Sequence, residues 1–227
     1  MLIKAHVIPE WMYKSLYDED HKLFSFSNTE HPSKAKRIPK GDYDKDILCS
    51  KCDGQMGVFE HYASTVFNGG PLITYNTSTV KGRIIHELSG FDYTKFKLFG
   101  LSLLWKASIS KRETYKHLKL DPSEEQTIKK MIIENDPGPS SSYPLMIWAM
   151  RSEDGKVLRE LILSPYSSSG SHIFFIAGYL FVFGSIGKNI TQEEYSLSQN
   201  GSIKIPAFST AEAYEILKKM YGINWLT

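Results

Sequence analysis

The chain has 227 residues, of which 41% are hydrophobic and 23% charged, so it can bury a sizeable core. Its 27 basic and 25 acidic residues give a net charge of +2, which excludes a global attraction to nucleic acid or anionic membrane. The N-terminus lacks the apolar segment of a secretory signal, and the longest apolar stretch, 173–183, is too short to span a bilayer. Two cysteines three residues apart do not form a disulfide scaffold. We therefore expect a cytoplasmic protein without membrane association.

The first seventy residues predict a small module. A short apolar strand over 2–7 precedes a helix that begins at Pro9, because proline suits the first helical turn. Alternation over 22–27 indicates a half-buried strand, and the polar, basic stretch 29–43 indicates a loop. A helix is expected over 56–67, where apolar residues recur on one face.

The next part of the chain predicts two strands and two helices. The strand-like runs 72–75 and 83–88 precede a helix that continues to about Ser108. Apolar residues surround most of that helix, so we expect it to be buried centrally. A second helix begins after Asp121, a typical cap, and ends near Asn135 before a Pro-Gly-Pro segment.

The last third is rich in strand-forming residues. Turn segments separate four β-rich runs, 143–150, 156–163, 173–176 and 180–183. This spacing predicts an antiparallel meander, followed by an amphipathic helix over 210–221. The predicted fold class is therefore α+β, with an N-terminal module (residues 1–70) packed without a flexible hinge on a mixed body (residues 71–227) that contains the meander and flanking helices.

The chain's two cysteines, Cys49 and Cys52, can direct their sulfurs to one point. This arrangement supplies half of a tetrahedral zinc site. The same spacing occurs in redox motifs, but those lie at the strand-to-helix turn of a βαβ unit, and no such pattern is visible here. A reduced pair in a turn, or half of a purely structural zinc site, is the alternative.

Two stretches carry a family resemblance: AHVIPEW at 5–11 and DILCSKCDGQ at 46–55 resemble the core of a divergent HNH endonuclease. They are also similar to a large set of uncharacterised bacterial proteins. The segments LYDEDH at 16–21 and VFEHYA at 58–63 continue this likeness. The resemblance covers about the first seventy residues and implies a ββα, treble-clef-like zinc-knuckle module.

The HNH mechanism implies roles for matching positions. His6 would be the general base that activates water against a phosphodiester, and a Mg²⁺ or Mn²⁺ ion would stabilise the leaving oxygen. Asp46 falls near the family's orienting Asn, and Asp53 falls on its terminal His or Asn. Both are carboxylates, which bind such hard cations. Ala5 departs from the family, because the residue before the catalytic His is often a metal ligand.

The cysteines would hold a structural zinc ion and the hairpin, rather than perform chemistry. Many such modules carry a second C-x-x-C pair, which is missing here, so His6, His21 or another side chain would have to complete the site. Four basic residues of the 29–43 loop form a candidate phosphate-binding cluster, with a solvated loop as the alternative: Lys34, Lys36, Arg37 and Lys40.

These observations predict an HNH-like, metal-dependent nucleic-acid phosphodiesterase, an endonuclease. The resemblance alone suggests a bacterial anti-phage defence or mobile-element setting. The alternative is a non-catalytic zinc-knuckle protein that binds a protein or nucleic acid as the partner of an effector. A third reading is a structural or inhibitory protein that holds no metal.

Overall fold

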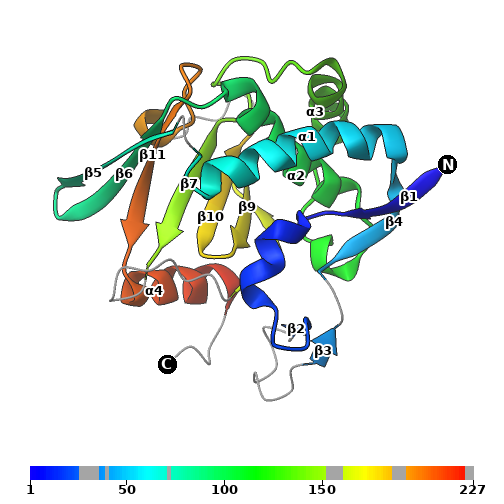
Figure 1. Ribbon diagram of the computed structural model, residues 1–227, viewed down its shortest axis with the longest axis horizontal. Coiled ribbons are helices and arrows are strands. Elements are labelled where there is room, and N and C mark those ends of the chain that lie inside the picture. The colour runs from blue at the N-terminus through cyan, green and yellow to red at the C-terminus, as the bar shows by residue number, and fades with distance from the viewer. Residues whose placement is uncertain (26–35, 39–40, 71–72, 152–160, 186–192, 223–227) are drawn as a thin grey trace.

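The chain folds around a mixed seven-stranded sheet (Figure 1). This computed structural model describes residues 1–25, 36–38, 41–70, 73–151, 161–185 and 193–222. Within these residues, two smaller antiparallel sheets of two strands each belong to the N-terminal part. The combination of helices with mixed and antiparallel sheets confirms the predicted α+β class.

The N-terminal part contains two strand pairs, a 3-10 helix and an α-helix. Its elements are β1 (Leu2–His6), η1 (Glu10–Leu16), β2 (Leu23–Ser25), β3 (Lys36–Ile38), β4 (Tyr43–Cys49) and α1 (Ser50–Phe67). The helix expected after Pro9 is the 3-10 helix η1, and β3 lies within the stretch predicted as a loop. Helix α1 begins six residues before the predicted position 56, because Cys49 caps it and Gly54 and Gly57 only interrupt its apolar pattern.

The remaining chain supplies the large sheet and three α-helices. Its elements are β5 (Thr74–Val80), β6 (Arg83–Ser89), α2 (Tyr93–Ile109), η3 (Glu113–Tyr115), α3 (Pro122–Glu134), β7 (Leu145–Met150), β8 (Tyr166–Ser168), β9 (Ser171–Ile176), β10 (Tyr179–Gly184), η4 (Glu193–Tyr195), β11 (Ser202–Phe208) and α4 (Thr210–Tyr221). The three predicted helices of this part are confirmed, with α3 ending at Asn135 in the left-handed conformation. Asp121 is the N-cap of α3, but its side chain makes no capping hydrogen bond.

The large sheet has the order β5-β6-β11-β7-β10-β9-β8. Strands β8, β9 and β10 pair antiparallel in chain order, as in a meander. The predicted meander is wrong in two respects, because β7 pairs with β10 rather than with the strand that follows it, and β8 lies outside the predicted runs. Strand β11 was not expected; it lies between β6 and β7 and runs parallel to β7. The predicted strand 156–163 lies largely outside the described residues, and Ile162 forms an isolated bridge with Ile176.

The central strands β7, β9 and β10 of the sheet are buried on both faces. Along β7, Leu145 and Ile147 belong to the large core beneath α2, whereas Met146 and Met150 belong to a second cluster with Leu217 of α4. This alternation follows from the two-residue period of a strand. The meander is therefore apolar on both sides, which explains why its sequence reads as continuous apolar runs.

The large core contains residues from before and after residue 70 of the chain. It contains Val7 and Ile8 from the N-terminal part together with residues of α2 and the sheet. Trp11 packs 6.2 Å from Phe99, and Phe67 packs 6.0 Å from Phe181, measured between ring centroids. The segment before residue 70 is thus packed directly on the body.

Helix α2 is buried around its circumference, as its apolar sequence predicts. It approaches the sheet closely at Gly100, where a Cβ atom would lie 2.9 Å from Leu145 Cδ2. Two lysines are nevertheless buried on this helix. Lys97 donates to the carbonyl oxygen of Tyr143, and burial lowers the pKa of Lys97 to about 7. Lys106 belongs to the candidate site below.

The low pKa of Lys97 makes stability depend on pH. In the unfolded chain this amine has its ordinary pKa of 10.5, so between about pH 7 and 10.5 the unfolded state binds more protons than the folded state. Stability therefore rises with pH in this window, by up to about 1.4 kcal/mol per unit. We expect Lys97→Met to be more stable than the wild type at pH 7, and the difference to shrink by about 2 kcal/mol at pH 9. Urea unfolding at both pH values measures it, and parallel profiles would contradict the assignment.

Candidate active site around His6 and Glu10

His6 lies at the end of β1, where the chain turns into η1. Its Nε2 atom lies 2.8 Å from the Glu10 carboxylate, and the two side chains are 32% and 39% exposed. Pro9 precedes η1 with a φ of −54°, a value that its ring fixes. The chain turns there, and the Glu10 side chain comes back to His6. The result is a partly exposed imidazole held against a carboxylate.

Glu10 is itself held by Tyr17. The Tyr17 hydroxyl donates to Glu10 Oε1 and accepts from the backbone N–H of Gly41 at 3.2 Å. Burial and the hydrogen bond to Glu10 raise the pKa of Tyr17 to about 12, so the phenol keeps its proton. The His21 ring stacks on Tyr17 with a centroid distance of 4.0 Å. A chain of contacts thus links His6, Glu10, Tyr17 and His21.

Lys106 fixes the backbone of His6. Its side chain is 1% exposed, and its Nζ donates to the His6 carbonyl oxygen at 2.9 Å and to Glu60 Oε1 at 2.6 Å. The first contact joins α2 to the end of β1, and the second joins α2 to α1. A single ammonium group therefore connects the three elements that surround the site.

A second carboxylate, Asp44, fixes the neighbouring end of β4. It pairs with Ala5 across the two-stranded sheet and is 8% exposed. Burial alone would raise the pKa of Asp44, but hydrogen bonds from Ser110 Oγ and from the backbone N–H groups of Asp46 and Lys111 hold it below its usual value. This carboxylate secures the loop that follows α2 and has no exposed oxygen to offer a substrate.

The structure does not bring the two predicted catalytic aspartates to His6. Asp46 is exposed on β4, and Asp53 lies half-buried in the first turn of α1. In the described part of the chain, neither forms a hydrogen bond or ion pair with His6. An acidic side chain in a first helical turn is stabilised by the helix dipole, which accounts for Asp53 without a catalytic role.

Cys49 and Cys52 lie at the junction of β4 and α1, with their sulfurs 3.3 Å apart. Cys49 is the N-cap of α1, and its sulfur accepts from the backbone N–H of Cys52 at 3.5 Å. This contact and the Cys52 thiol lower the pKa of Cys49, whereas the contact with Cys49 and burial raise the pKa of Cys52. The pair is therefore at a strand-to-helix turn, which the sequence interpretation had not found, although β1 and β4 are antiparallel rather than part of a βαβ unit.

The predicted histidine ligands are not beside this pair. Cys49 pairs with Leu2 and His6 pairs with Tyr43, so they lie at opposite ends of the β1–β4 sheet, separated by about 13 Å. His21 stacks on Tyr17 instead. Among the residues that the structure describes, no three His, Cys, Asp or Glu side chains are grouped closely enough to hold a metal ion.

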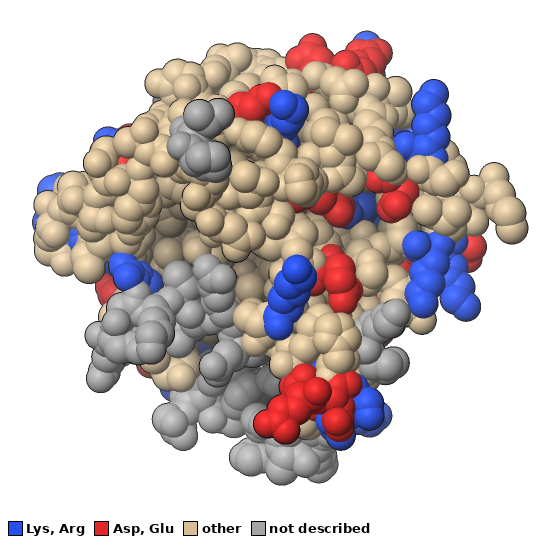
Figure 2. All heavy atoms as spheres, in the orientation of Figure 1, with Lys and Arg blue, Asp and Glu red and all other residues tan. Residues whose placement is uncertain are grey.

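The predicted phosphate-binding cluster is only partly visible. Lys34 and Lys40 lie outside the described residues, and Lys36 is exposed on β3. Arg37 is paired with Asp18 and, at 2.8 Å, with Asp20, so its charge is already compensated. Figure 2 shows basic and acidic side chains mixed on the face of the molecule that it draws, in keeping with the small net charge.

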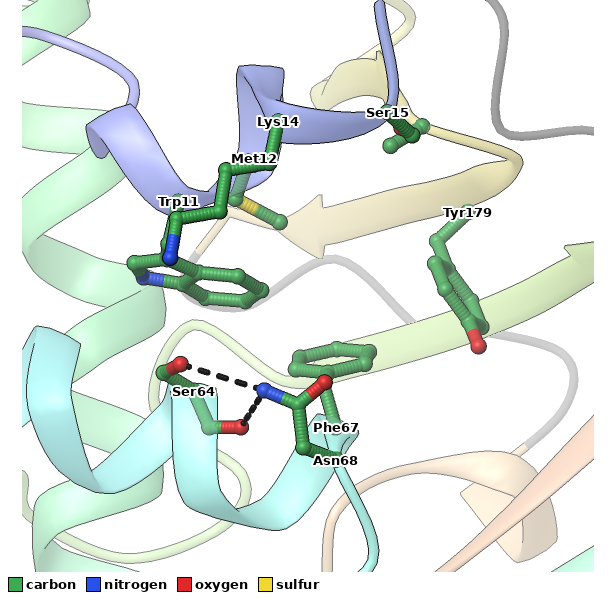
Figure 3. Close-up of a pocket in the computed structure, with 9 residues that line it drawn as sticks. Trp11, Met12, Lys14, Ser15, Ser64, Phe67, Asn68 and Tyr179 are labelled. Atoms are coloured by element: carbon green, nitrogen blue, oxygen red, sulfur yellow. Dashed lines mark hydrogen bonds between the residues drawn. The ribbon is translucent and has the colours of Figure 1, made fainter.

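A pocket of about 190 Å³ opens between η1, the C-terminal end of α1 and the turn before β10 (Figure 3). Three of its lining rings form a row: Trp11 to Phe67 at 5.7 Å and Phe67 to Tyr179 at 5.0 Å between centroids. Lys14 also lines it, and Trp11 Nε1 is buried without a hydrogen-bond partner among the described residues. The aromatic lining suits contact with a planar group.

Four residues of the site had no role in the sequence analysis: Glu10, Tyr17, Glu60 and Lys106. Glu10 carried a usable signal, because an acidic residue follows His6 directly after a proline that turns the chain. Lys106 carried another, since a lysine in a helix that is apolar on all sides must find a buried partner. Its partner was not predictable, because Glu60 is far away in sequence.

No protein-family model, curated protein or solved structure matches this chain. None of the helices within the described residues combines the length and the hydrophobicity that crossing a membrane requires.

The buried ion pair between Lys106 and Glu60 predicts large, coupled effects on stability. Lys106→Met leaves Glu60 without its cation, and Glu60→Gln leaves a buried ammonium without its carboxylate. Each should lower the free energy of unfolding by about 3 kcal/mol, and the double variant by clearly less than the sum.

Urea unfolding measures all three variants. A matched control is Lys130→Met, which removes an exposed ion pair with Glu134 on α3 and should change stability by less than about 0.5 kcal/mol. Strictly additive losses would show that the two buried side chains do not act as a pair.

Proposed function

We propose that the chain is a nucleic-acid phosphodiesterase of HNH-like organisation, with His6 as the general base. The observation that carries this proposal is the contact between His6 Nε2 and Glu10 at 2.8 Å, at the end of β1, where the His6 side chain is 32% exposed. The arrangement β1, β4, α1 supports it, because two antiparallel strands followed by a helix are what the HNH likeness implies.

The contact defines which nitrogen would act. The Glu10 carboxylate favours a proton on Nε2, which leaves Nδ1 of the neutral imidazole as the atom that can accept a proton. Nδ1 would take a proton from water as that water attacks the phosphorus atom of a phosphodiester. The bond from phosphorus to the leaving sugar oxygen would break, and that oxygen would take a proton from solvent water. Glu10 would then stabilise the imidazolium that forms, and Lys106 would keep the His6 backbone in place.

The aromatic pocket supports a nucleic-acid substrate. Trp11 directly follows Glu10 in the chain. Its ring forms a row with the rings of Phe67 and Tyr179, and an unpaired base can stack on such a row. Lys14 at the same pocket offers a charge to a phosphate. Both groups would hold a strand beside His6.

Metal ions enter this proposal without an assigned step. The described residues supply two of the four ligands of a structural zinc site, and Glu10 beside His6 is not joined by enough further His, Cys, Asp or Glu side chains to hold Mg²⁺ or Mn²⁺, so they do not fit the ions that the HNH likeness implies. We therefore assign no bond-breaking step to a metal ion. A role in anti-phage defence or in a mobile element has the resemblance as its sole support.

A plasmid-nicking assay with Mg²⁺ or Mn²⁺, repeated with single-stranded DNA and RNA, tests the proposal. We expect cleavage by the wild type and a loss of about 100-fold or more in His6→Ala, because general-base catalysis contributes on that order. Glu10→Gln should cause a smaller loss, since it leaves the imidazole in place.

His61→Ala is the matched control, because His61 is exposed on α1 in the same part of the chain and should not affect cleavage. Cleavage that survives in His6→Ala would remove His6 from the mechanism. A folded wild type that cleaves none of the three substrates would favour the alternative, a non-catalytic partner of an effector.

A further inference from the structure

The cysteine pair forms a site that the proposed function does not use. Both thiols are free and half-buried, and they stand where β4 ends and α1 begins. The sulfur–sulfur distance of 3.3 Å exceeds a disulfide bond by roughly 1.2 Å, a gap that small side-chain rotations can close. The pair can therefore be oxidised without rearrangement of the fold.

The two sulfurs have different surroundings. Cys49 Sγ receives the backbone N–H of Cys52 at the positive end of an 18-residue helix, which stabilises a thiolate. Cys52 lies inside the first turn and packs against the hydrophobic core, which disfavours a charge. One sulfur is thus suited to attack, and the other to resolve the product of that attack.

We propose that Cys49 and Cys52 form a reversible dithiol–disulfide pair that exchanges with low-molecular-weight disulfides. The Cys49 thiolate attacks one sulfur of the disulfide, forms a mixed disulfide and releases one thiolate, which takes a proton from water. The Cys52 thiol then loses its proton to water, and its sulfur attacks Cys49 Sγ and releases the second thiolate. The protein dithiol loses two electrons, and the small disulfide gains them as two thiols.

Oxidation would join the last residue of β4 to the first turn of α1 by a covalent bond. The pair lies about 13 Å from His6 along the β1–β4 sheet, so the exchange does not require the nuclease site. The exchange is followed through the oxidation state of the two sulfurs, which is measured separately from nucleic-acid cleavage. Either proposal can therefore fail without the other.

Titration of the full chain with mixtures of reduced and oxidised glutathione tests this site, with free thiols trapped by iodoacetamide and counted by intact mass. We expect both thiols to disappear together, in a two-electron transition without a lasting glutathione adduct. Two independent adducts would overturn the proposal, as would a bound zinc ion that protects both thiols until a chelator removes it.

Single variants test the order of attack. Cys52→Ser should accumulate a glutathione adduct at Cys49, and Cys49→Ser should form its adduct at least about tenfold more slowly at pH 7. In urea, the same two variants should react at equal rates, because the helix no longer exists. Equal rates in the folded variants would show that α1 does not activate Cys49.

Discussion

The site depends on one buried ammonium group. Lys106 extends from the last turn of α2 and donates to the carbonyl oxygen that ends β1 and to the carboxylate of Glu60 on α1. A buried cation is costly unless it is paired and fully hydrogen-bonded. The His6 carbonyl oxygen and the Glu60 carboxylate must therefore lie within hydrogen-bond distance of Lys106 Nζ. The position of the His6 backbone follows from that constraint, and Glu10 then contacts the imidazole from across the turn between β1 and η1.

The β1–β4 sheet separates two kinds of chemistry. At one end, a histidine and a carboxylate lie in contact. At the other end, the N-terminus of α1 lies against two thiols. The sequence analysis joined these features into a single metal site, but antiparallel pairing puts Cys49 beside Leu2 rather than beside His6.

Local patterns in the sequence predicted much of the fold. The apolar surround of α2, the amphipathic pattern of α4 and the caps of α3 are properties of neighbouring residues, and the structure follows them. Strand β11 was missed because Lys204 and Pro206 interrupt its apolar alternation, and its place is fixed by pairing with distant strands. The contact between Lys106 and His6 spans 100 residues, so no local pattern reveals it.

Native-state hydrogen exchange of the Lys106→Met variant tests the central role of this side chain most directly. If Lys106 holds the N-terminal strand against the two helices, the variant should open locally at β1 and β4 in addition to its global loss of stability. Exchange of the β1 and β4 amides should then accelerate at least about tenfold more than that of the β7 and β10 amides. Unchanged exchange in β1 and β4, or an equal increase in every strand, would contradict the account.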